Sequence, residues 1–346
     1  MSLFKQFAVV LLSLLSFSLA ISYSTRAATG EFNDGEYTRI VYPDWFNDSF
    51  LELREDLAEA VAADKQGLMV FFSTEGCSYC GLFVRESLSN PAIAAVTQER
   101  FAAVGLEIFS DAEMTDPRGT PMRVKEFAAA EGVEYAPTLL FYDGDGQRIL
   151  RAVGYQSPAR FRAILDYLGD GHYRTTDFRG FLQQRQSASG ASDTGRLQND
   201  PLFSSPPYAL DRSRFDAERP LLVIFEQRGC EECDDFHRDV LALAEVRDLL
   251  ERFEVVRLDA QDDQTPILAP DGSRLTPAAW FQQTDFSRVP ALLFFNEQGE
   301  QVLQTDALVK RQRMMNSCFF VVEKAYDKGW TYQRLARSKA IERARR

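Results

Sequence analysis

The sequence lacks two features that would place the protein in a membrane or on nucleic acid. The chain has 346 residues, and after Ile21 it contains no apolar stretch long enough to cross a bilayer. Basic residues are too few to balance the acidic ones, with 39 against 51. Removing Lys5 and Arg26 with the N-terminal segment described below leaves a net charge of 37 − 51 = −14. This charge argues against nucleic acid as a partner.

Cysteine is also scarce, with five residues in the chain. Four of them form two Cys-x-x-Cys pairs, which are too close in sequence to close a useful loop, so a framework of structural disulfides is not indicated. The fifth, Cys318, lies in the apolar segment 317–322 and is predicted to be a buried core thiol rather than a reactive one.

The N-terminal segment 1–27 is predicted to be a secretory signal peptide. It contains Lys5, then fifteen apolar or small residues from Phe7 to Ile21, then small residues up to a cleavage site near Ala27. The alternative is an uncleaved membrane anchor, for which the apolar core is short. Cleavage would leave a soluble mature protein, without stable membrane insertion, in the periplasm or an equivalent space.

The first Cys-x-x-Cys motif follows a strand-like apolar run, 68–72, and precedes a helical segment that ends near Leu88. A thiol in the first turn of a helix faces unpaired N–H groups and the positive end of the helix dipole, which favours its thiolate. Cys77 is therefore predicted to be the attacking sulfur. Cys80, one turn later, is placed to resolve a mixed disulfide.

A proline opens another apolar strand sixty residues further on, in Tyr135-Ala136-Pro137-Thr138 followed by 139–142. A cis bond beside the dithiol would explain a proline at this place. The backbone of the preceding residue would then be presented to an extended substrate segment. We therefore predict substrate binding at Ala136 and Pro137.

This order of elements resembles thioredoxin: a strand, a Cys-x-x-Cys motif, a helix, an X-Pro-Thr segment, and a strand followed by Asp145-Gly146. The pattern occurs twice, because Cys230 and Cys233 follow the apolar run 221–225 and Pro290 opens 292–295. The copies are offset by 230 − 77 = 153 residues without a gap. The matched pairs are Gly76/Gly229, Cys77/Cys230, Cys80/Cys233, Gly119/Gly272, Pro137/Pro290 and Gly146/Gly299.

The resemblance implies an α/β fold of two tandem thioredoxin-like domains, each with a central mixed sheet flanked by helices. The domains are expected at 33–185 and 208–330, joined by a flexible linker, 186–207, that is poor in large apolar residues. By the same register, Val289 and Pro290 are the second substrate-binding pair. The basic C-terminal segment 331–346 is predicted to be a solvated helix, with docking to a partner or an anionic surface as the alternative.

The resemblance also implies the activity, a thiol–disulfide oxidoreductase that works through Cys77, Cys80, Cys230 and Cys233 without cofactor or metal. Residues 43–46 and Gly154-Tyr155 are similar to exported thioredoxin-like proteins of the sulfur-oxidation (SoxW-like) type. This similarity suggests sulfur-oxidation or cytochrome-maturation proteins as clients and a membrane thiol reductase as electron donor. Reduction or isomerisation is favoured over oxidation, because neither motif has a cationic cluster to stabilise a thiolate strongly.

The two motifs differ in charge. Carboxylates surround Cys230, and they should raise its thiol pKa and make the second site the more reducing one. They are Glu226, Glu231, Glu232, Asp234 and Asp235. His237 is predicted to be exposed on the helix, with proton transfer as the alternative. The acid that thioredoxins usually bury six residues before the first cysteine is replaced by Phe71 and Ile224, so proton transfer is expected to use water or a surface group.

Two other functions compete with this interpretation. A zinc protein could use the four paired cysteines, but each motif has its own strand, helix and proline, and the pairs are far apart in sequence. A client-binding scaffold could retain both folds after one copy, most plausibly the second, had lost its chemistry. Titration of the thiols would separate these alternatives.

Overall fold

Two apolar runs form the central strands of two sheets in the computed structural model, which describes residues 32–188 and 196–345. Both β1 (Gly67–Ser73) and β7 (Leu221–Glu226) are buried along their whole length. Each has a parallel neighbour on one side and an antiparallel neighbour on the other. Strands covered on both faces read as continuous apolar runs, which is why the sequence predicts them well.

The first copy contains the strand before the dithiol, the helix after it and the strand after Pro137 that the sequence predicts, and it continues into a further helix. Its elements in chain order are α1 (Leu53–Ala62), β1, α2 (Ser78–Phe83), the π-helical turn η1 (Val84–Leu88), α3 (Pro91–Arg100), β2 (Phe101–Glu107), β3 (Glu113–Thr115), β4 (Pro121–Arg123), α4 (Val124–Ala130), β5 (Thr138–Asp143), β6 (Arg148–Val153), α5 (Pro158–Gly169), the short 3-10 helix η2 (His172–Arg174) and α6 (Phe178–Ala188).

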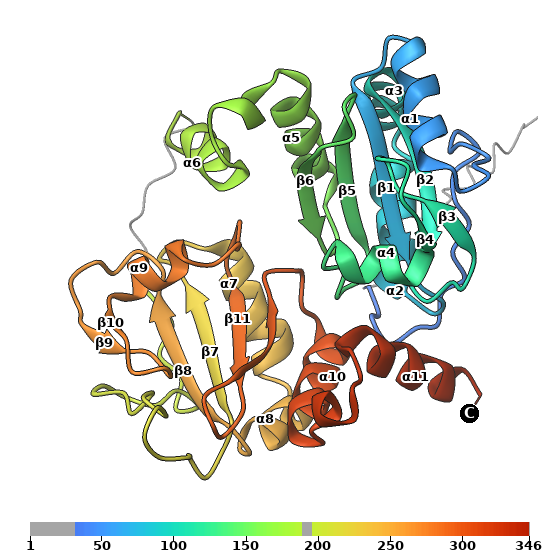
Figure 1. Ribbon diagram of the computed structural model, residues 1–346. Coiled ribbons are helices and arrows are strands. Elements are labelled where there is room, and N and C mark those ends of the chain that lie inside the picture. Colours follow the sequence, from blue (N-terminus) through green and yellow to red (C-terminus); the bar gives the residue numbers. More distant parts are fainter. Residues whose placement is uncertain (1–31, 189–195, 346) are drawn as a thin grey trace, which may run out of the picture. The chain divides into compact units, whose positions relative to one another are not determined.

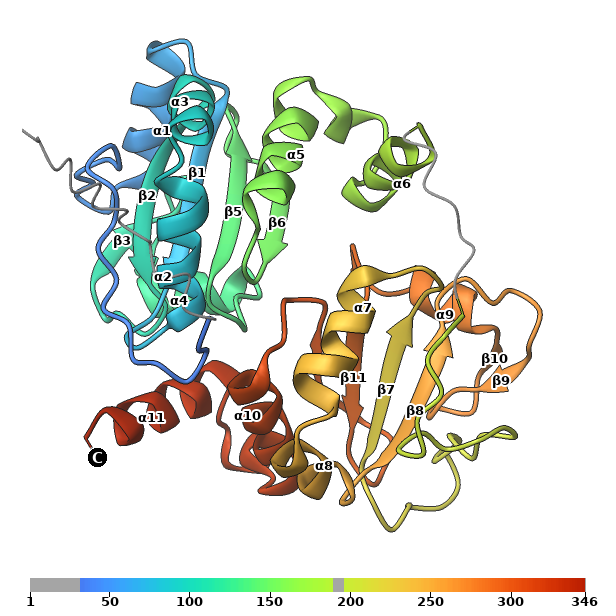
Figure 2. The same cartoon turned by 180° about the vertical axis from the view of Figure 1, so that it is seen from behind.

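Its sheet has the strand order β2-β1-β5-β6 and is covered on both faces. Helices α2, α3 and α5 lie on one face, and α1 and α4 lie on the other (Figures 1 and 2). Alternate side chains of β1 pack against the helices on the two faces of the sheet. Phe71 packs edge-on against Phe83 of α2, with ring centroids 5.5 Å apart, whereas Phe72 contacts Phe127 of α4 at 5.9 Å.

The second copy repeats this arrangement with the strand order β12-β11-β7-β8. Its elements are β7, α7 (Glu231–Phe236), the π-helical turn η3 (His237–Leu241), α8 (Ala244–Leu250), β8 (Glu254–Asp259), β9 (Ile267–Leu268), β10 (Arg274–Leu275), α9 (Pro277–Gln282), β11 (Ala291–Phe295), β12 (Gln301–Thr305), α10 (Arg311–Val322), the 3-10 helix η4 (Ala325–Lys328) and α11 (Tyr332–Ala344). The expected pair of α/β domains is confirmed.

The 153-residue register extends beyond the dithiols. It relates α5 to α10, since 158 + 153 = 311, and it relates the start of α6 to that of α11 within one residue, since 178 + 153 = 331. The basic C-terminal helix is therefore the second copy's version of α6 rather than an appendage. The polar loop between β2 and α4 contains a short antiparallel hairpin, β3–β4. Its counterpart between β8 and α9 contains the hairpin β9–β10.

The region between the copies differs from the expected flexible linker where it is described. Leu202 and Phe203 pack against the core of the second copy, and the Ser204 N–H donates to the Val255 carbonyl oxygen at 2.8 Å. Asp200 accepts a hydrogen bond from Arg247 at 3.1 Å. The predicted signal peptide lies outside the described residues. Within residues 32–188 and 196–345, no helix has the length and apolar character needed to span a membrane.

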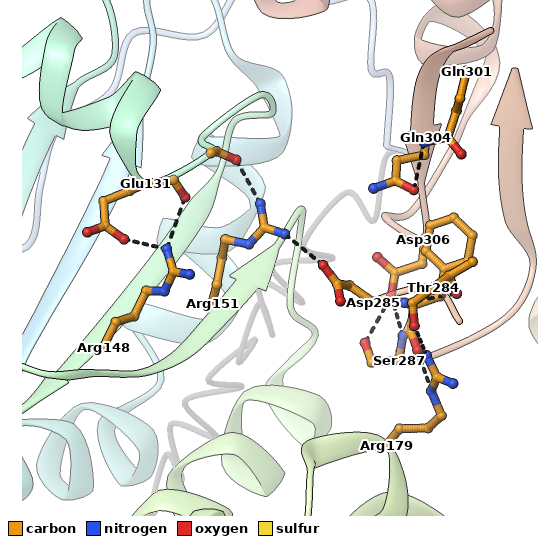
Figure 3. Close-up of polar contacts among 12 residues, drawn as sticks. Glu131, Arg148, Arg151, Arg179, Thr284, Asp285, Ser287, Gln301, Gln304 and Asp306 are labelled. Carbon is orange, nitrogen blue, oxygen red and sulfur yellow. Dashed lines mark hydrogen bonds and ion pairs between the residues drawn. The ribbon is translucent and has the colours of Figure 1, made fainter. Parts of the chain in front are cut away.

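Polar contacts connect β6 and α6 with the loop that precedes β11 (Figure 3). Arg179 of α6 donates to the carbonyl oxygens of Phe286 and Thr284 at 2.5 and 2.6 Å. Arg151 of β6 forms an ion pair with Asp285 at 3.5 Å. All these residues belong to one compact unit that begins at Asn33.

Candidate functional site

The first dithiol lies where β1 ends and α2 begins. Cys77 is the N-cap of α2, and its Sγ accepts a hydrogen bond from the Cys80 N–H at 3.1 Å. The two cysteines form a disulfide with their Cα atoms 5.3 Å apart. An N–H group aimed at the first sulfur would stabilise a thiolate there after reduction, as the position of this cysteine at a helix start predicts.

The two sulfurs of this pair differ in access. Cys77 is 9% exposed, whereas Cys80 is fully buried. Cys77 and Ala136 line the same cavity of about 40 Å³, so the predicted nucleophile and the predicted client-binding backbone face one space. The geometry agrees with attack by Cys77 and resolution by Cys80, and these roles stay predictions.

Both proline bonds have the expected form. The Ala136-Pro137 and Val289-Pro290 peptides are cis. Pro137 immediately precedes β5, and Pro290 immediately precedes β11. The Val289 carbonyl oxygen lies 4.0 Å from Cys230 Sγ, so the proline-containing segment of the second copy is adjacent to its dithiol.

The second dithiol reproduces the first in its backbone geometry. Cys230 is the N-cap of α7, and its Sγ accepts a hydrogen bond from the Cys233 N–H at 3.0 Å. These cysteines form a second disulfide with a Cα separation of 5.2 Å, and they are 6% and 4% exposed. The four sulfurs thus belong to two separate pairs. Within the described ranges 32–188 and 196–345, no group of His, Cys, Asp and Glu side chains has a metal-binding arrangement.

His237 is not exposed, so the prediction for this residue was wrong. It is 7% exposed, and its Nε2 lies 2.8 Å from Oε1 of Glu226, which is itself 1% exposed. The error has a physical cause. Glu226 is the last residue of β7 and points inward, whereas the sequence alone suggested that it belongs to the carboxylates around Cys230.

The second copy therefore buries an acid–base pair close to its dithiol helix. His237 follows Cys233 by four residues, which places both on one face of the continuous helix α7–η3. The equivalent positions of the first copy, 153 residues earlier, are Ser73 and Val84. The pair is thus particular to the second copy.

The carboxylate next to the first dithiol, Glu75, is hydrogen-bonded to a tyrosine and paired with an arginine. Tyr37 donates a hydrogen bond to Glu75 at 2.6 Å, and Arg337 donates another at 2.9 Å. The hydrogen bond from Tyr37, followed by that from Arg337, lowers the pKa of Glu75. Glu75 therefore stays ionised beside Gly76 and Cys77 while its charge is balanced by α11.

Two residues that contact the predicted client-binding backbone, Gln333 and Arg313, were not predicted from the sequence. The Ala136 N–H donates to Oε1 of Gln333 in α11 at 2.8 Å, and Arg313 of α10 donates to the Ala136 carbonyl oxygen at 3.0 Å. The prediction of a solvated C-terminal helix was therefore wrong. A narrow apolar stripe of Tyr332, Leu335 and Ala340, each at most 5% exposed, was the signal available in the sequence.

The remaining cysteine is a core residue, as predicted. Cys318 lies in α10, is fully buried and packs among the apolar side chains of the second sheet. Burial raises the pKa of its thiol to about 12, so it remains protonated near neutral pH. Cys318 is thus separated from the exchange chemistry of the two pairs.

A family model described as a thioredoxin-like domain matches residues 53–169 and 209–317. No curated protein matches the chain significantly.

Solved structures that resemble the chain include a thioredoxin-fold protein from Helicobacter pylori, with 28% identity, coverage of 36% of this chain and 82% of that chain, and a TM-score of 0.32. A thioredoxin from Thermus thermophilus has 25% identity, coverage of 36% and 95%, and a TM-score of 0.28. A protein disulfide oxidoreductase from Aeropyrum pernix K1 has 14% identity, coverage of 84% and 97%, and a TM-score of 0.23.

Proposed function

The chain belongs to the thioredoxin-like domain family, and we propose that it is an exported thiol–disulfide oxidoreductase that reduces or isomerises disulfides of client proteins. The observation that carries this proposal is the repeated site geometry. In each copy the second cysteine's N–H points at the first cysteine's sulfur, at 3.1 and 3.0 Å, where a helix begins. This arrangement suits a thiolate nucleophile with a resolving thiol one turn away.

The proposed reaction at the first site proceeds in two exchanges. The Cys77 thiolate attacks one sulfur of a client disulfide, so that a Cys77–client bond forms, the client S–S bond breaks and a client thiolate leaves. The Cys80 thiolate then attacks Cys77 Sγ, forms the intramolecular disulfide and releases the second client thiolate. The dithiol of the protein loses two electrons, and the client disulfide gains them.

The protein must then be reduced again by an electron donor. A membrane thiol reductase is the class of donor that fits a protein exported through a signal peptide at 1–27, which would place the reaction in the periplasm. Neither Cys-x-x-Cys motif contains a cationic cluster that would stabilise a thiolate strongly enough for an oxidase. The arginines that line the Cys77 cavity include Arg313 and Arg337, which are bonded to the Ala136 carbonyl oxygen and to Glu75. Reduction or isomerisation is therefore the proposed direction, with sulfur-oxidation or cytochrome-maturation proteins as the proposed client class.

Reduction of oxidised client by the purified, pre-reduced protein tests the proposal. The chain in which all four paired cysteines are serine is the matched control, since it retains Cys318. Faster appearance of client thiols than with this control is the expected result. Equal rates would overturn the proposal.

Two variants that each retain one pair extend this test to the alternative of a client-binding scaffold. Activity in the Cys77/Cys80 pair alone would assign the second copy to client binding. Activity in both pairs supports the two-dithiol enzyme.

A further inference from the structure

The backbone of Ala136 has both of its polar groups bonded within the chain. Its N–H donates to Gln333, and its carbonyl oxygen accepts from Arg313. An extended client segment that added as a strand beside Pro137 would need these same two groups. Gln333 and Arg313 therefore stand where the backbone of a client would bind.

The start of α10 is also held by the first copy. Its own N-cap residue, Lys310, supplies no side-chain cap. The Asp34 carboxylate accepts hydrogen bonds from the N–H groups of Gln312 and Arg313 at 2.9 and 2.8 Å instead, and Tyr79 accepts one from the Lys310 N–H at 2.9 Å. A carboxylate at a helix N-terminus satisfies free N–H groups and interacts favourably with the helix dipole.

Tyr79, one of the two residues between the paired cysteines, is covered by this contact. It is 4% exposed, and the Arg313 guanidinium lies 3.6 Å from the centre of its ring. Stacking of a guanidinium on a buried aromatic ring is a favourable cation–π contact. The surface that a client would meet beside Cys77 is thus occupied by α10.

Helix α11 lies next to α10, below the first sheet in Figure 1, and it also contacts the first copy. Arg337 binds Glu75 at 2.9 Å, and the rings of Tyr332 and Tyr135 lie 4.6 Å apart. A Cβ added at Gly76 would lie 3.1 Å from the Ala340 Cβ, so the helix touches the loop before Cys77. The cavity of about 40 Å³ that remains beside Cys77 has room for a few water molecules.

We propose that α10 and α11 are an internal occupant of the first client site, and that a protein client reaches the Cys77–Cys80 pair only after these helices are displaced. The occupant is this chain's own C-terminal region, which carries the second dithiol domain's last two long helices. The inference rests on the proposed function, because it concerns access to the same dithiol.

The rate with a protein client is then proportional to the population of the open state, in which α10 and α11 are displaced from the first site. Gln333 and Arg337 contribute one hydrogen bond or ion pair each to the closed state. Loss of one such contact should raise the open population by about three- to tenfold. A small disulfide needs less space than a protein segment, so its rate should change less.

The test uses the full chain with Cys230→Ser and Cys233→Ser, so that only the first dithiol reacts. Gln333→Ala and Arg337→Gln are introduced separately, and Arg334→Gln is the matched control, because Arg334 lies on the same helix but stacks on Trp330. Rates are measured with insulin and with hydroxyethyl disulfide. Insulin reduction should rise three- to tenfold in the first two variants and stay unchanged in the control, while the rate with hydroxyethyl disulfide changes less than twofold.

Hydrogen exchange at the Ala136 amide provides a readout independent of activity. Arg337→Gln leaves the Gln333 acceptor in place, so faster exchange at Ala136 in this variant would report opening of the helices. Insulin reduction at the unmodified rate in both variants, or Ala136 hydrogen exchange at the unmodified rate in Arg337→Gln, would overturn the proposal. If no variant, nor the parent chain, reduced either insulin or hydroxyethyl disulfide, the proposed function itself would be overturned.

Discussion

Arg160 and Arg313 occupy equivalent positions in the two copies, since 313 − 160 = 153, and each reaches the segment before the other copy's cis proline. Arg313 donates to the Ala136 carbonyl oxygen at 3.0 Å, and Arg160 donates to the Ser287 hydroxyl at 2.7 Å. Each arginine lies in the first turn of its copy's last sheet-covering helix. The contacts are reciprocal, because each copy supplies one arginine to the segment before the other copy's proline.

The first prediction assigns the roles of the first pair in a chain whose second pair is serine. Cys77→Ser should abolish disulfide reduction, because the more exposed sulfur that accepts an N–H hydrogen bond is removed. Cys80→Ser should accumulate mixed disulfides with clients, because no resolving thiol remains. Mass spectrometry of trapped adducts measures both outcomes. Faster alkylation of Cys80 than of Cys77 in the reduced protein would contradict the assignment.

The second prediction is that the second dithiol is the more reducing one, which would let electrons pass from it to the first. Glu231, Glu232 and Asp234 remain exposed around Cys230, whereas Glu75 beside Cys77 is bonded to Arg337. A rise of one pKa unit in the nucleophilic thiol corresponds to about 30 mV for the two-electron couple. The expected difference is therefore a few tens of millivolts.

Glutathione redox titration of two full-length chains, each with one pair changed to serine, measures this difference. A second pair that is equally or more oxidising, or that never forms its disulfide, would exclude the transfer.

The third prediction concerns the buried pair of Glu226 and His237. His237→Val, the residue of the first copy, leaves the Glu226 carboxylate buried without its partner. Loss of one member of a buried pair costs about 3 kcal/mol, so the free energy of unfolding should fall by about that amount. Adding Glu226→Ser, again the first copy's residue, should recover most of it.

Urea denaturation of the wild-type, single and double variants measures this coupling. A single variant as stable as the wild type would show that the pair is not held together in solution. The rate of exchange at Cys230/Cys233 in the same variants tests whether the pair also carries protons. A changed pH profile with unchanged stability in the double variant would indicate a chemical role.

The fourth prediction is that Cys318 does not react in the folded protein. After reduction, native titration should detect four thiols and denaturing titration five. Its folded pKa of about 12 lies above the ordinary value of 9.0, so its contribution to stability is complete below pH 9 and is lost as the pH rises toward 12. A Cys318→Ala chain should lose less stability in this range than the parent. Rapid native alkylation of Cys318 would contradict the prediction.

The sequence predicted the parts of the fold that depend on local pattern. The apolar runs of β1 and β7, the helix starts at Cys77 and Cys230 and the repeat register all follow from neighbouring residues. The β3–β4 hairpin was missed because its strands, such as Glu113–Thr115, have only three residues within a polar loop. Strands this short show no usable alternation.

The site was less predictable, because its missing parts come from residues distant in sequence. Glu226 belongs with His237 only because a strand end and a helix face meet in the folded core. Gln333 contacts Ala136 across 197 residues. The charge composition alone suggested that the C-terminal helix is solvated. Its packing is determined instead by an apolar stripe whose members, Tyr332, Leu335 and Ala340, are three and five residues apart.

The contacts of Gln333 and Arg337 join segments of one chain, so mass action treats them differently from contacts between two molecules. A tethered group meets its site at an effective concentration that reaches millimolar values for short connections. A client at micromolar concentration would then have to bind the first site about a thousandfold more tightly than the tethered helix to occupy it half of the time. Selection among clients at this site therefore depends on how well each client competes with the covalently attached helix α11.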